Sequence, residues 1–219
     1  MSADSLRVLT MFSDWFDVMP PVRSMFPKPL WHGEAAADAC ASGNECQIGG
    51  FVHTPDGQTK WFSERFNKLD FDTQKIPVQS DLQRNITCFE TLAQMALLYL
   101  VSRSFPGFRL PLRIRTVSDN TGAEAGSNKL FTTSFPQCLF LEKLCLLAAR
   151  TCAEIDVSHI PGSDNEAADA LSRWDLISDP PHAFSLSDRV SISLDALWTS
   201  PLSISLHPVD AHIMWKIPS

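Results

Sequence analysis

Residues 156–174, DVSHIPGSDNEAADALSRW, decide how this chain is expected to fold. The stretch begins with polar and apolar residues in alternation, which is typical of a β-strand. Pro161 and Gly162 then break the strand, and the residues from about Asn165 to Trp174 form a short helical pattern that carries Asp169. A charged carboxylate placed against a core costs several kcal/mol unless a partner meets it. We therefore expect Asp169 either to be solvated or to meet a positive group.

The chain before this stretch contains a hairpin followed by alternating strands and helices. Strands are predicted at 35–39, 46–53, 60–66, 112–119 and 154–160, and helices at 86–103, 121–132, 136–152 and 165–174. The turn TPDGQT joins the second and third strands as a β-hairpin. The polar segment 67–85 is expected to be a loop. The order β-β-β-α-β-α-α-β-α predicts an α/β fold with a mixed sheet and helices packed on it.

Proline-containing flanks bound this domain, which we place at residues 34–174. Residues 1–33 contain four prolines between positions 20 and 29, and these prevent a continuous helix there. We expect a leader or linker with at most one short helix near Val8–Val18. Residues 175–219 combine prolines with many serines, so we expect a tail or linker that can be disordered. Within it, RVSISLDALW (189–198) could alternatively pair as a strand.

The composition is that of an ordinary globular protein. The 219 residues are 44% hydrophobic and 20% charged, which is enough for one domain with a sizeable core. A net charge of −7 argues against a simple basic nucleic-acid binder. The sequence contains no Cys-x-x-Cys pair, so it gives no sign of a structural zinc site. Because no signal peptide or bilayer-spanning run is evident, we expect an intracellular protein, cytoplasmic or nuclear and not secreted.

Four carboxylates occur where a solvated acid is not expected. They are Asp38 in the apolar strand AAADACA, Glu90 in the most apolar helix, Asp119 at the end of RIRTVSD, and Asp169 on the final helix. Each has a simple explanation alone: Glu90 can favour a helix dipole, Asp119 can cap a helix, and the other two can lie at a strand end and on the surface. Together at one end of a sheet they would repel one another unless cations intervene.

Divalent metal ions would remove that repulsion. Mg²⁺ prefers one or two carboxylates together with waters and substrate phosphate oxygens. Two such ions, roughly 3.5–4 Å apart, clamp the attacking and leaving oxygens of a phosphoryl displacement. The four acids therefore predict a site that handles phosphate esters, with the positive charge supplied by metal ions.

These residues resemble a known family, the ribonuclease H domain of retroelement reverse transcriptases. The resemblance covers about residues 34–174 and rests on four motifs. They are Asp38-Ala39 before the Ile48-Gly49-Gly50 hairpin, FETLAQMALL around Glu90, VSDN at 117–120, and HIPGSDNEAADALSR at 159–173. The last motif is the most specific, and it is similar to the retrotransposon version rather than the cellular one.

The resemblance implies a ribonuclease H-like fold, a mixed five-stranded sheet flanked by helices, and an endonuclease that cuts the RNA strand of RNA–DNA hybrids. It implies two Mg²⁺ ions, for which Mn²⁺ can substitute. Asp38 would bridge both ions, Glu90 and Asp119 would help to hold one, and Asp169 would hold the other. His159 matches the family's mobile histidine, thought to assist proton transfer or product release, and a histidine that titrates near neutrality suits that task.

Three polar residues are weaker candidates for substrate contact. Ser118 and Asn120 flank Asp119, and Asn165 precedes the final helix. Asn120 can equally cap a helix. The implied partners are an RNA–DNA hybrid and a reverse transcriptase domain in cis or in trans, because the chain has no Tyr-x-Asp-Asp polymerase signature. No membrane partner is expected.

Other classes remain as alternatives. Exonucleases of the DEDD type carry Asp-x-Glu on the first strand, where this chain has Cys40 after Asp38-Ala39, and integrases usually place Glu at the position of Asp169. A catalytically weak or inactive ribonuclease H-like module could bind nucleic acid or protein as a scaffold, and a decayed element is a third possibility. All four acids favour the enzyme, because a scaffold gains nothing from mutually repelling carboxylates.

Overall fold

The structure is a computed structural model that describes residues 3–18, 30–31, 33–54, 56–104, 112–151, 153–181 and 184–199. The four prolines of the predicted leader and residues 200–219 of the predicted tail lie outside these ranges. Within the described ranges, no helix has both the length and the apolar character needed to cross a membrane.

One mixed sheet organises the chain. Its strands are β1 (Leu30–Trp31), β2 (Glu34–Ser42), β3 (Glu45–His53), β4 (Thr59–Asn67), β5 (Leu112–Ser118) and β6 (Ala153–His159). The five long strands lie in the order β4-β3-β2-β5-β6, antiparallel from β4 to β2 and parallel from β2 to β6. The short β1 pairs with the beginning of β5, on the edge that β2 also uses. This is the predicted mixed five-stranded sheet with one short addition.

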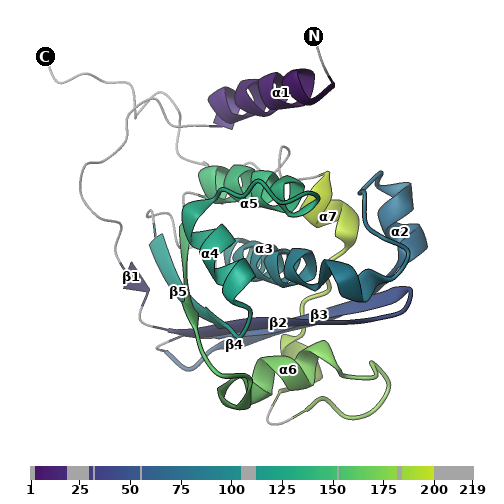
Figure 1. The fold of residues 1–219 in the computed structure, drawn as a ribbon. Coiled ribbons are helices and arrows are strands. Elements are labelled where there is room, and N and C mark those ends of the chain that lie inside the picture. Colours follow the sequence, from purple (N-terminus) through teal and green to yellow (C-terminus); the bar gives the residue numbers. More distant parts are fainter. Residues whose placement is uncertain are drawn as a thin grey trace, which may run out of the picture.

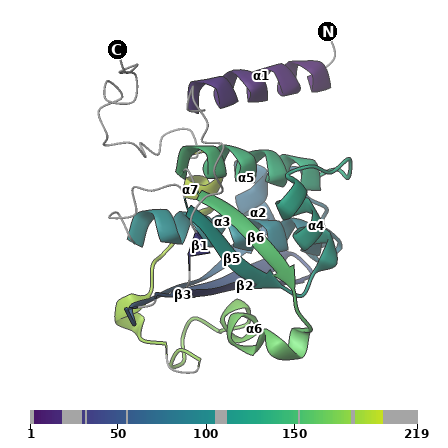
Figure 2. The ribbon, with the colours of Figure 1, turned by 90° about the vertical axis from the view of Figure 1, so that its left-hand side faces the viewer.

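Helices cover the two faces of this sheet unequally (Figure 1). The helices are α1 (Ala3–Val18), α2 (Lys68–Thr73), α3 (Ile86–Ser104), α4 (Thr121–Lys129), α5 (Gln137–Thr151), α6 (Glu166–Ser172) and α7 (Leu194–Trp198), with 3₁₀ turns at Leu82–Asn85, Gly162–Asp164 and Leu186–Asp188. Helix α3 lies on one face beneath α5, and α6 lies on the opposite face (Figure 2). The fold class, α/β with a mixed five-stranded sheet flanked by helices, is confirmed.

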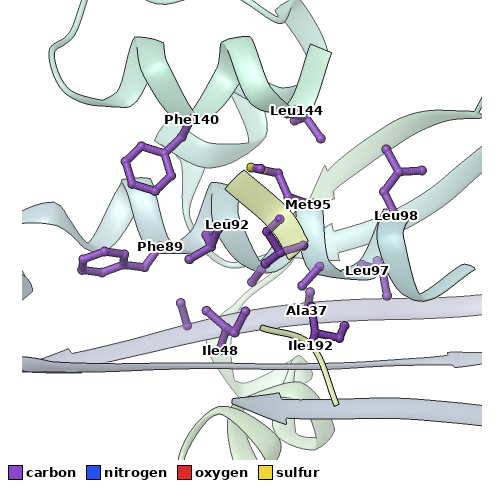
Figure 3. Close-up of a cluster of buried hydrophobic side chains, with 14 of the residues drawn as sticks. Ala37, Ile48, Phe89, Leu92, Met95, Leu97, Leu98, Phe140, Leu144 and Ile192 are labelled. Atoms are coloured by element: carbon purple, nitrogen blue, oxygen red, sulfur yellow. The ribbon is translucent and has the colours of Figure 1, made fainter. Parts of the chain in front are cut away.

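Helix α3 lies at the centre of the main core (Figure 3). It is apolar around most of its circumference, and Phe89, Leu92 and Met95 are fully buried. Ile48 of the sheet packs on one side of the helix and Phe140 of α5 on the other. Burying each such side chain contributes about 1.5–3 kcal/mol, so this layer supplies most of the apolar burial that holds the fold together.

The face under α6 carries a smaller core. It consists of Ala36, Phe51, Trp61, Ala168, Leu171 and Trp174. Helix α6 comes so close to β3 that a Cβ atom on Gly49 would lie 2.3 Å from the backbone nitrogen of Ser172 and 2.4 Å from the carbonyl carbon of Leu171. The absent side chain of Gly49 therefore sets how closely α6 approaches the sheet.

The segment 67–85 was predicted to be a loop, and this prediction was wrong for α2 and for the 3₁₀ turn at Leu82–Asn85. Asn67 begins α2 with a capping box: its side chain accepts hydrogen bonds from the Leu69 and Asp70 backbone, and the Asp70 carboxylate accepts one from the Asn67 backbone. Such reciprocal bonds satisfy backbone groups that a short polar helix would otherwise leave to water. Apolar periodicity alone does not reveal a helix of six residues.

Residues 184–199 pack against the domain, whereas the sequence predicted a tail or linker there. The Val190 amide donates to the Trp61 carbonyl of β4 at 2.8 Å, and Arg189 forms an isolated parallel bridge with Trp61. Phe184 packs with the small core under α6, while Leu194 and Leu197 are buried in the main core. The segment thus passes around the β4 edge from one face to the other. These apolar residues find their partners only after the sheet has formed.

The outer edge of β6 is covered at one point by a side chain. Asn128 of α4 donates to the Val157 carbonyl at 2.7 Å and accepts from the Val157 amide at 2.8 Å. Its carboxamide therefore makes the two bonds that a neighbouring strand would make at this residue.

Candidate metal centre

The site lies where β2 and β5 stop pairing. The two strands are paired at Ala36 and Val117, and Asp38 and Asp119 each come two residues later. Glu90 reaches the same place from α3. One carboxylate oxygen from each of the three acids lies within 4.8 Å of the others. The ends of two parallel strands and one buried helix therefore bring together Asp38, Glu90 and Asp119, three of the four acids that the sequence predicted to converge.

Glu90 is the acid whose environment is most unfavourable for a charge. Its side chain is enclosed, with only 3% of the residue exposed. Burial raises its pKa to about 9, the charges of Asp38 and Asp119 add to the increase, and a hydrogen bond from the Ala39 backbone opposes it. Its Oε2 atom is buried without a hydrogen-bond partner among the described residues. An unsatisfied buried polar atom costs about 1–3 kcal/mol, and a cation between the acids would satisfy it.

Asp38 is buried as well, but it has hydrogen-bond partners on α6. The Ser172 hydroxyl donates to Oδ2 at 2.6 Å, and the Asn165 amide donates to Oδ1 over a long 3.5 Å. Burial raises the Asp38 pKa to about 6, the Ser172 hydrogen bond opposes this, and the charges of Asp119 and Asp169 add to it. The bonds from α6 fix where the Asp38 carboxylate points. The sequence did not single out Ser172, although it follows Asp169 by three positions on the same helix face.

Asp119 is the exposed member of the group. The loop after β6 lies against it, because the Ile160 amide donates to the Ser118 carbonyl at 3.1 Å. A Cβ atom on Gly162 would lie 3.1 Å from Asp119 Oδ2. The absence of a side chain at Gly162 therefore leaves room for a ligand at this carboxylate oxygen. The glycine of the Pro161-Gly162 break thus keeps Asp119 accessible.

Asp169 lies outside the group of three. Its side chain is 42% exposed, and Oδ1 accepts a hydrogen bond from Arg173 Nε at 2.6 Å. Its charge nevertheless raises the pKa of both Asp38 and Glu90. The positive group that meets Asp169 in this structure is thus Arg173, one helical turn further on. The i,i+4 spacing of the two residues could have been recognised as an ion pair.

The remaining predicted residues surround the acids. His159 ends β6 as the partner of Ser118 in the β5–β6 ladder, and its side chain is exposed. Ser118 is fully buried, and its hydroxyl accepts a hydrogen bond from the backbone amide of Asn120 at 3.2 Å. The Asn120 side-chain oxygen caps the first turn of α4, which is the alternative that the sequence left open. Asn165 is buried against Asp38.

Two further side chains, which sequence reasoning missed, hold α6 in place. Gln47 Nε2 donates to the carbonyls of Leu171 at 3.3 Å and Trp174 at 2.6 Å, and the Ser63 hydroxyl donates to Leu171 at 2.7 Å. Ser63 and Gln47 lie 108 and 124 positions away from Leu171 in the chain. No local pattern marks bonds over such separations, so only the folded sheet reveals them.

The ligand atoms in this site suit a hard divalent cation. The three acids offer only carboxylate oxygens, which Mg²⁺, Mn²⁺ and Ca²⁺ prefer over nitrogen or sulfur. A bound ion would also offset the repulsion between the carboxylates and meet the unpartnered oxygen of Glu90. The residues present therefore fit a divalent metal ion.

Comparison with known proteins gives structural neighbours without sequence relatives. No protein-family model and no curated protein matches the chain. Among solved structures, it is similar to ribonuclease H1 from the halophilic archaeon Halobacterium salinarum, at 19% identity and a TM-score of 0.43, over 64% of this chain and 93% of the other. The N-terminal ribonuclease H domain of a Mycobacterium tuberculosis protein gives 17% identity and 0.43, over 64% and 91%. Prototype foamy virus protease–reverse transcriptase gives 14% and 0.36, over 70% of this chain and 21% of the viral one.

Proposed function

We propose that this chain is a metal-dependent endonuclease that hydrolyses the RNA strand of RNA–DNA hybrids, as part of retroelement reverse transcription. The observation that carries the proposal is Glu90, a buried carboxylate with an unpartnered oxygen beside two more acids. Such a group destabilises a fold that has no cation to place there. The motifs that resemble retroelement ribonuclease H domains contain all three acids.

The residues of the proposed centre divide into ligands and supports. Asp38, Glu90 and Asp119 would hold one Mg²⁺, Asp38 and Asp169 a second, and Mn²⁺ could substitute. When bound, such ions activate water and stabilise charge on the leaving oxygen. The chain itself keeps the ligands in position. Apolar packing of α3 fixes Glu90, and the Ser172 hydroxyl orients Asp38.

We assign His159 to proton transfer or product release. It is exposed at the end of β6 and pairs with the residue directly before Asp119, so it can exchange protons with water close to the acids. Of the weaker candidates, Asn120 is half-buried and is proposed as a substrate contact. Ser118 and Asn165 are buried, and we assign them to the support of the strand end and of Asp38.

The proposed partners are an RNA–DNA hybrid and a reverse transcriptase domain in cis or in trans. A hybrid duplex is recognised mainly by its shape and by contacts to 2′-hydroxyls and phosphates. A chain of net charge −7 gains little general attraction for such a polyanion. A polymerase domain that holds the same hybrid would raise its local concentration at the acids.

One observation favours the alternative of a catalytically weak or inactive module that binds nucleic acid or protein. Arg173 already pairs with Asp169, the acid proposed for the second ion. If that pair persisted in the presence of metal and substrate, the centre would hold a single ion and hydrolysis would be slow.

A cleavage assay separates the two functions. The full chain is incubated with an RNA–DNA hybrid labelled on the RNA strand, with Mg²⁺ or Mn²⁺, and matched RNA and DNA duplexes serve as controls. We expect the hybrid's RNA strand to be cut, and Asp38→Asn to reduce the rate by roughly a thousandfold, since the lost metal binding is worth several kcal/mol. Glu45→Gln, an exposed acid on β3, should cleave as the wild type does. Cleavage that persists in Asp38→Asn contradicts the proposal, and hybrid binding without cleavage supports the module.

A further inference from the structure

The geometry points to Arg173 as a switchable counter-ion. We infer that its guanidinium occupies Asp169 until a divalent cation binds there, and that the released side chain then contacts a backbone phosphate of the substrate. This inference rests on the proposed nuclease function. It adds a residue that positions the substrate and that competes with metal binding.

The ion pair is close but accessible. Arg173 Nε lies 2.6 Å from Asp169 Oδ1, and the two side chains are 63% and 42% exposed. Exposed ion pairs of this kind are weak, so an arriving divalent cation can outweigh the pair. Arg173 follows the last residue of α6, so its long side chain can leave Asp169 without moving the helix.

The carboxylates of the proposed centre differ in whether a positively charged side chain pairs with them. None of the ion pairs between described residues involves Asp38, Glu90 or Asp119, whereas Asp169 has Arg173. The charge of Arg173 also acts on Asp38, because it lowers the pKa that burial raises. A cation bound between Asp38 and Asp169 would therefore meet a positive charge in place, and it must displace that charge to use Asp169.

The displaced guanidinium would lie next to the position of the reacting phosphate. Its planar fork suits two parallel hydrogen bonds to phosphate oxygens. In a chain of net charge −7, one such contact matters, because affinity for nucleic acid depends on the number of phosphates that are neutralised. Metal and substrate would then support each other: the metal frees Arg173, and the phosphate keeps it away from Asp169.

The first test measures metal binding without catalysis. Mn²⁺ is titrated into the full-length wild type, Arg173→Gln and Arg113→Gln. Arg113 is a suitable control, since its half-exposed side chain forms an ion pair with Asp156 at 3.0 Å. It lies about 20 Å along β5 from Asp119 at 3.3 Å per residue. We expect Arg173→Gln to tighten the weaker Mn²⁺ binding step by about two- to fivefold. Arg113→Gln should leave it unchanged.

The second test measures hybrid binding by the same proteins. Ca²⁺ replaces Mn²⁺, because its larger and more flexible coordination sphere supports binding while being poorly matched to a site built for Mg²⁺. We expect Arg173→Gln to weaken the affinity for the RNA–DNA hybrid severalfold and to reduce the salt dependence by about one phosphate contact. Arg173→Lys should recover part of this loss, because it keeps the charge but not the fork.

The opposite signs of the two effects make the inference falsifiable. Tighter Mn²⁺ together with weaker hybrid binding supports it. Weaker binding of both ligands, with a lowered melting temperature, would show that Arg173 merely stabilises α6 and would overturn the inference, as would Mn²⁺ affinity equal to that of Arg113→Gln. If the wild type binds no Mn²⁺, the proposed function itself fails. If it binds Mn²⁺ and cuts hybrids while the variants do not differ, only the inference fails.

Discussion

Helices α3 and α6 lie on opposite faces of the sheet, and each brings one acid near Asp38. Helix α3 has 19 residues, and most of them are buried in the main core. Helix α6 has 7 residues, too few to be stable without tertiary contacts. It depends on the close approach at Gly49 and on hydrogen bonds from Gln47 and Ser63. One half of the centre is thus fixed by packing in the main core, and the other half by a smaller core together with a few polar bonds.

The two acids differ in the same way as their helices. Glu90 is buried, has a raised pKa and forms no ion pair with a described residue, while Asp169 is half-exposed beside Arg173. A carboxylate ligand fixed in a core is positioned before any metal binds. Its burial lowers the stability of the metal-free fold. A ligand on a short exposed helix can change partners. In the proposed centre, α3 would therefore provide affinity for the metal and α6 would provide control over it.

Replacing Glu90 should give the largest effect. We expect Glu90→Gln to lower hybrid cleavage by roughly a thousandfold, because it removes a metal ligand. At pH 7 the metal-free variant should be more stable by on the order of 3 kcal/mol, since burial raises the Glu90 pKa from 4.5 to about 9 and the neutral amide avoids that cost. Cleavage assays and urea unfolding measure the two changes, with Glu45→Gln as control. A variant that is inactive but no more stable would show that Glu90 is not under strain.

The pH dependence of the metal-free protein should show the same cost. Between pH 4.5 and about 9, the folded state keeps a proton on Glu90 that the unfolded chain releases, and Asp38 behaves likewise from 3.8 to about 6. Stability should therefore fall as pH rises, by up to about 1.4 kcal/mol per pH unit for each group. Urea midpoints in the presence of a chelator should be higher at pH 5 than at pH 8, and Mn²⁺ should reduce the difference. A profile that rises with pH would contradict the raised pKa values.

The close approach of α6 can be tested at Gly49. An added methyl group would meet backbone atoms of α6, so Gly49→Ala should destabilise the protein by about 1–3 kcal/mol and weaken Mn²⁺ binding as α6 moves away from Asp38. Gly126→Ala in α4 is the control. There the new Cβ meets only the ends of the Gln137 and Leu141 side chains at 3.1 Å, and alanine favours a helix by about 0.5–1 kcal/mol. Equal unfolding midpoints for the two variants would show that α6 can shift at no cost.

The smallest effect is expected for the hydroxyl that links α6 to Asp38. Ser172→Ala removes the 2.6 Å hydrogen bond to Oδ2 and should cost about 1 kcal/mol. Amide hydrogen exchange should become faster in α6 and stay unchanged in α3, because the lost bond links only α6 to Asp38. Ser163→Ala, an exposed serine in the loop before α6, provides the comparison. Faster exchange in both helices would mean that the two halves are not independent.

The sequence revealed the α3 half of this comparison better than the α6 half. Strands with alternating residues and an apolar helix are local patterns, and an acid inside them, such as Asp38 or Glu90, stands out as an anomaly. Asp169 was also singled out, but its i,i+4 spacing from Arg173, the local signal of its partner, was not used. The sequence allowed either solvent or a positive group, and the structure shows Arg173. The bonds from Gln47 and Ser63 to α6 join distant parts of the chain, so no local pattern predicts them.

The segments that were predicted as irregular show a second limit. Helix α2 arises from a capping box around Asn67 rather than from apolar periodicity. The spacing of the apolar side chains in residues 184–199 does not by itself predict their packing, because their partners lie on β4 and in the core of the folded domain. Serine and proline content predicted a tail or linker there, and in residues 184–199 tertiary contacts outweigh that local composition.

Residues 189–190 on β4 and the Asn128 side chain on β6 each cover one point on an outer border of the sheet. An uncovered border strand is a template for pairing with another molecule, and so a route to aggregation. A chain ended after Trp174 would keep every acid of the centre yet expose the border of β4 and the apolar surface around Trp61. Such a chain should precipitate or form oligomers where the longer one stays monodisperse. Residues 184–190 are therefore relevant to solubility as well as to the shape of the domain.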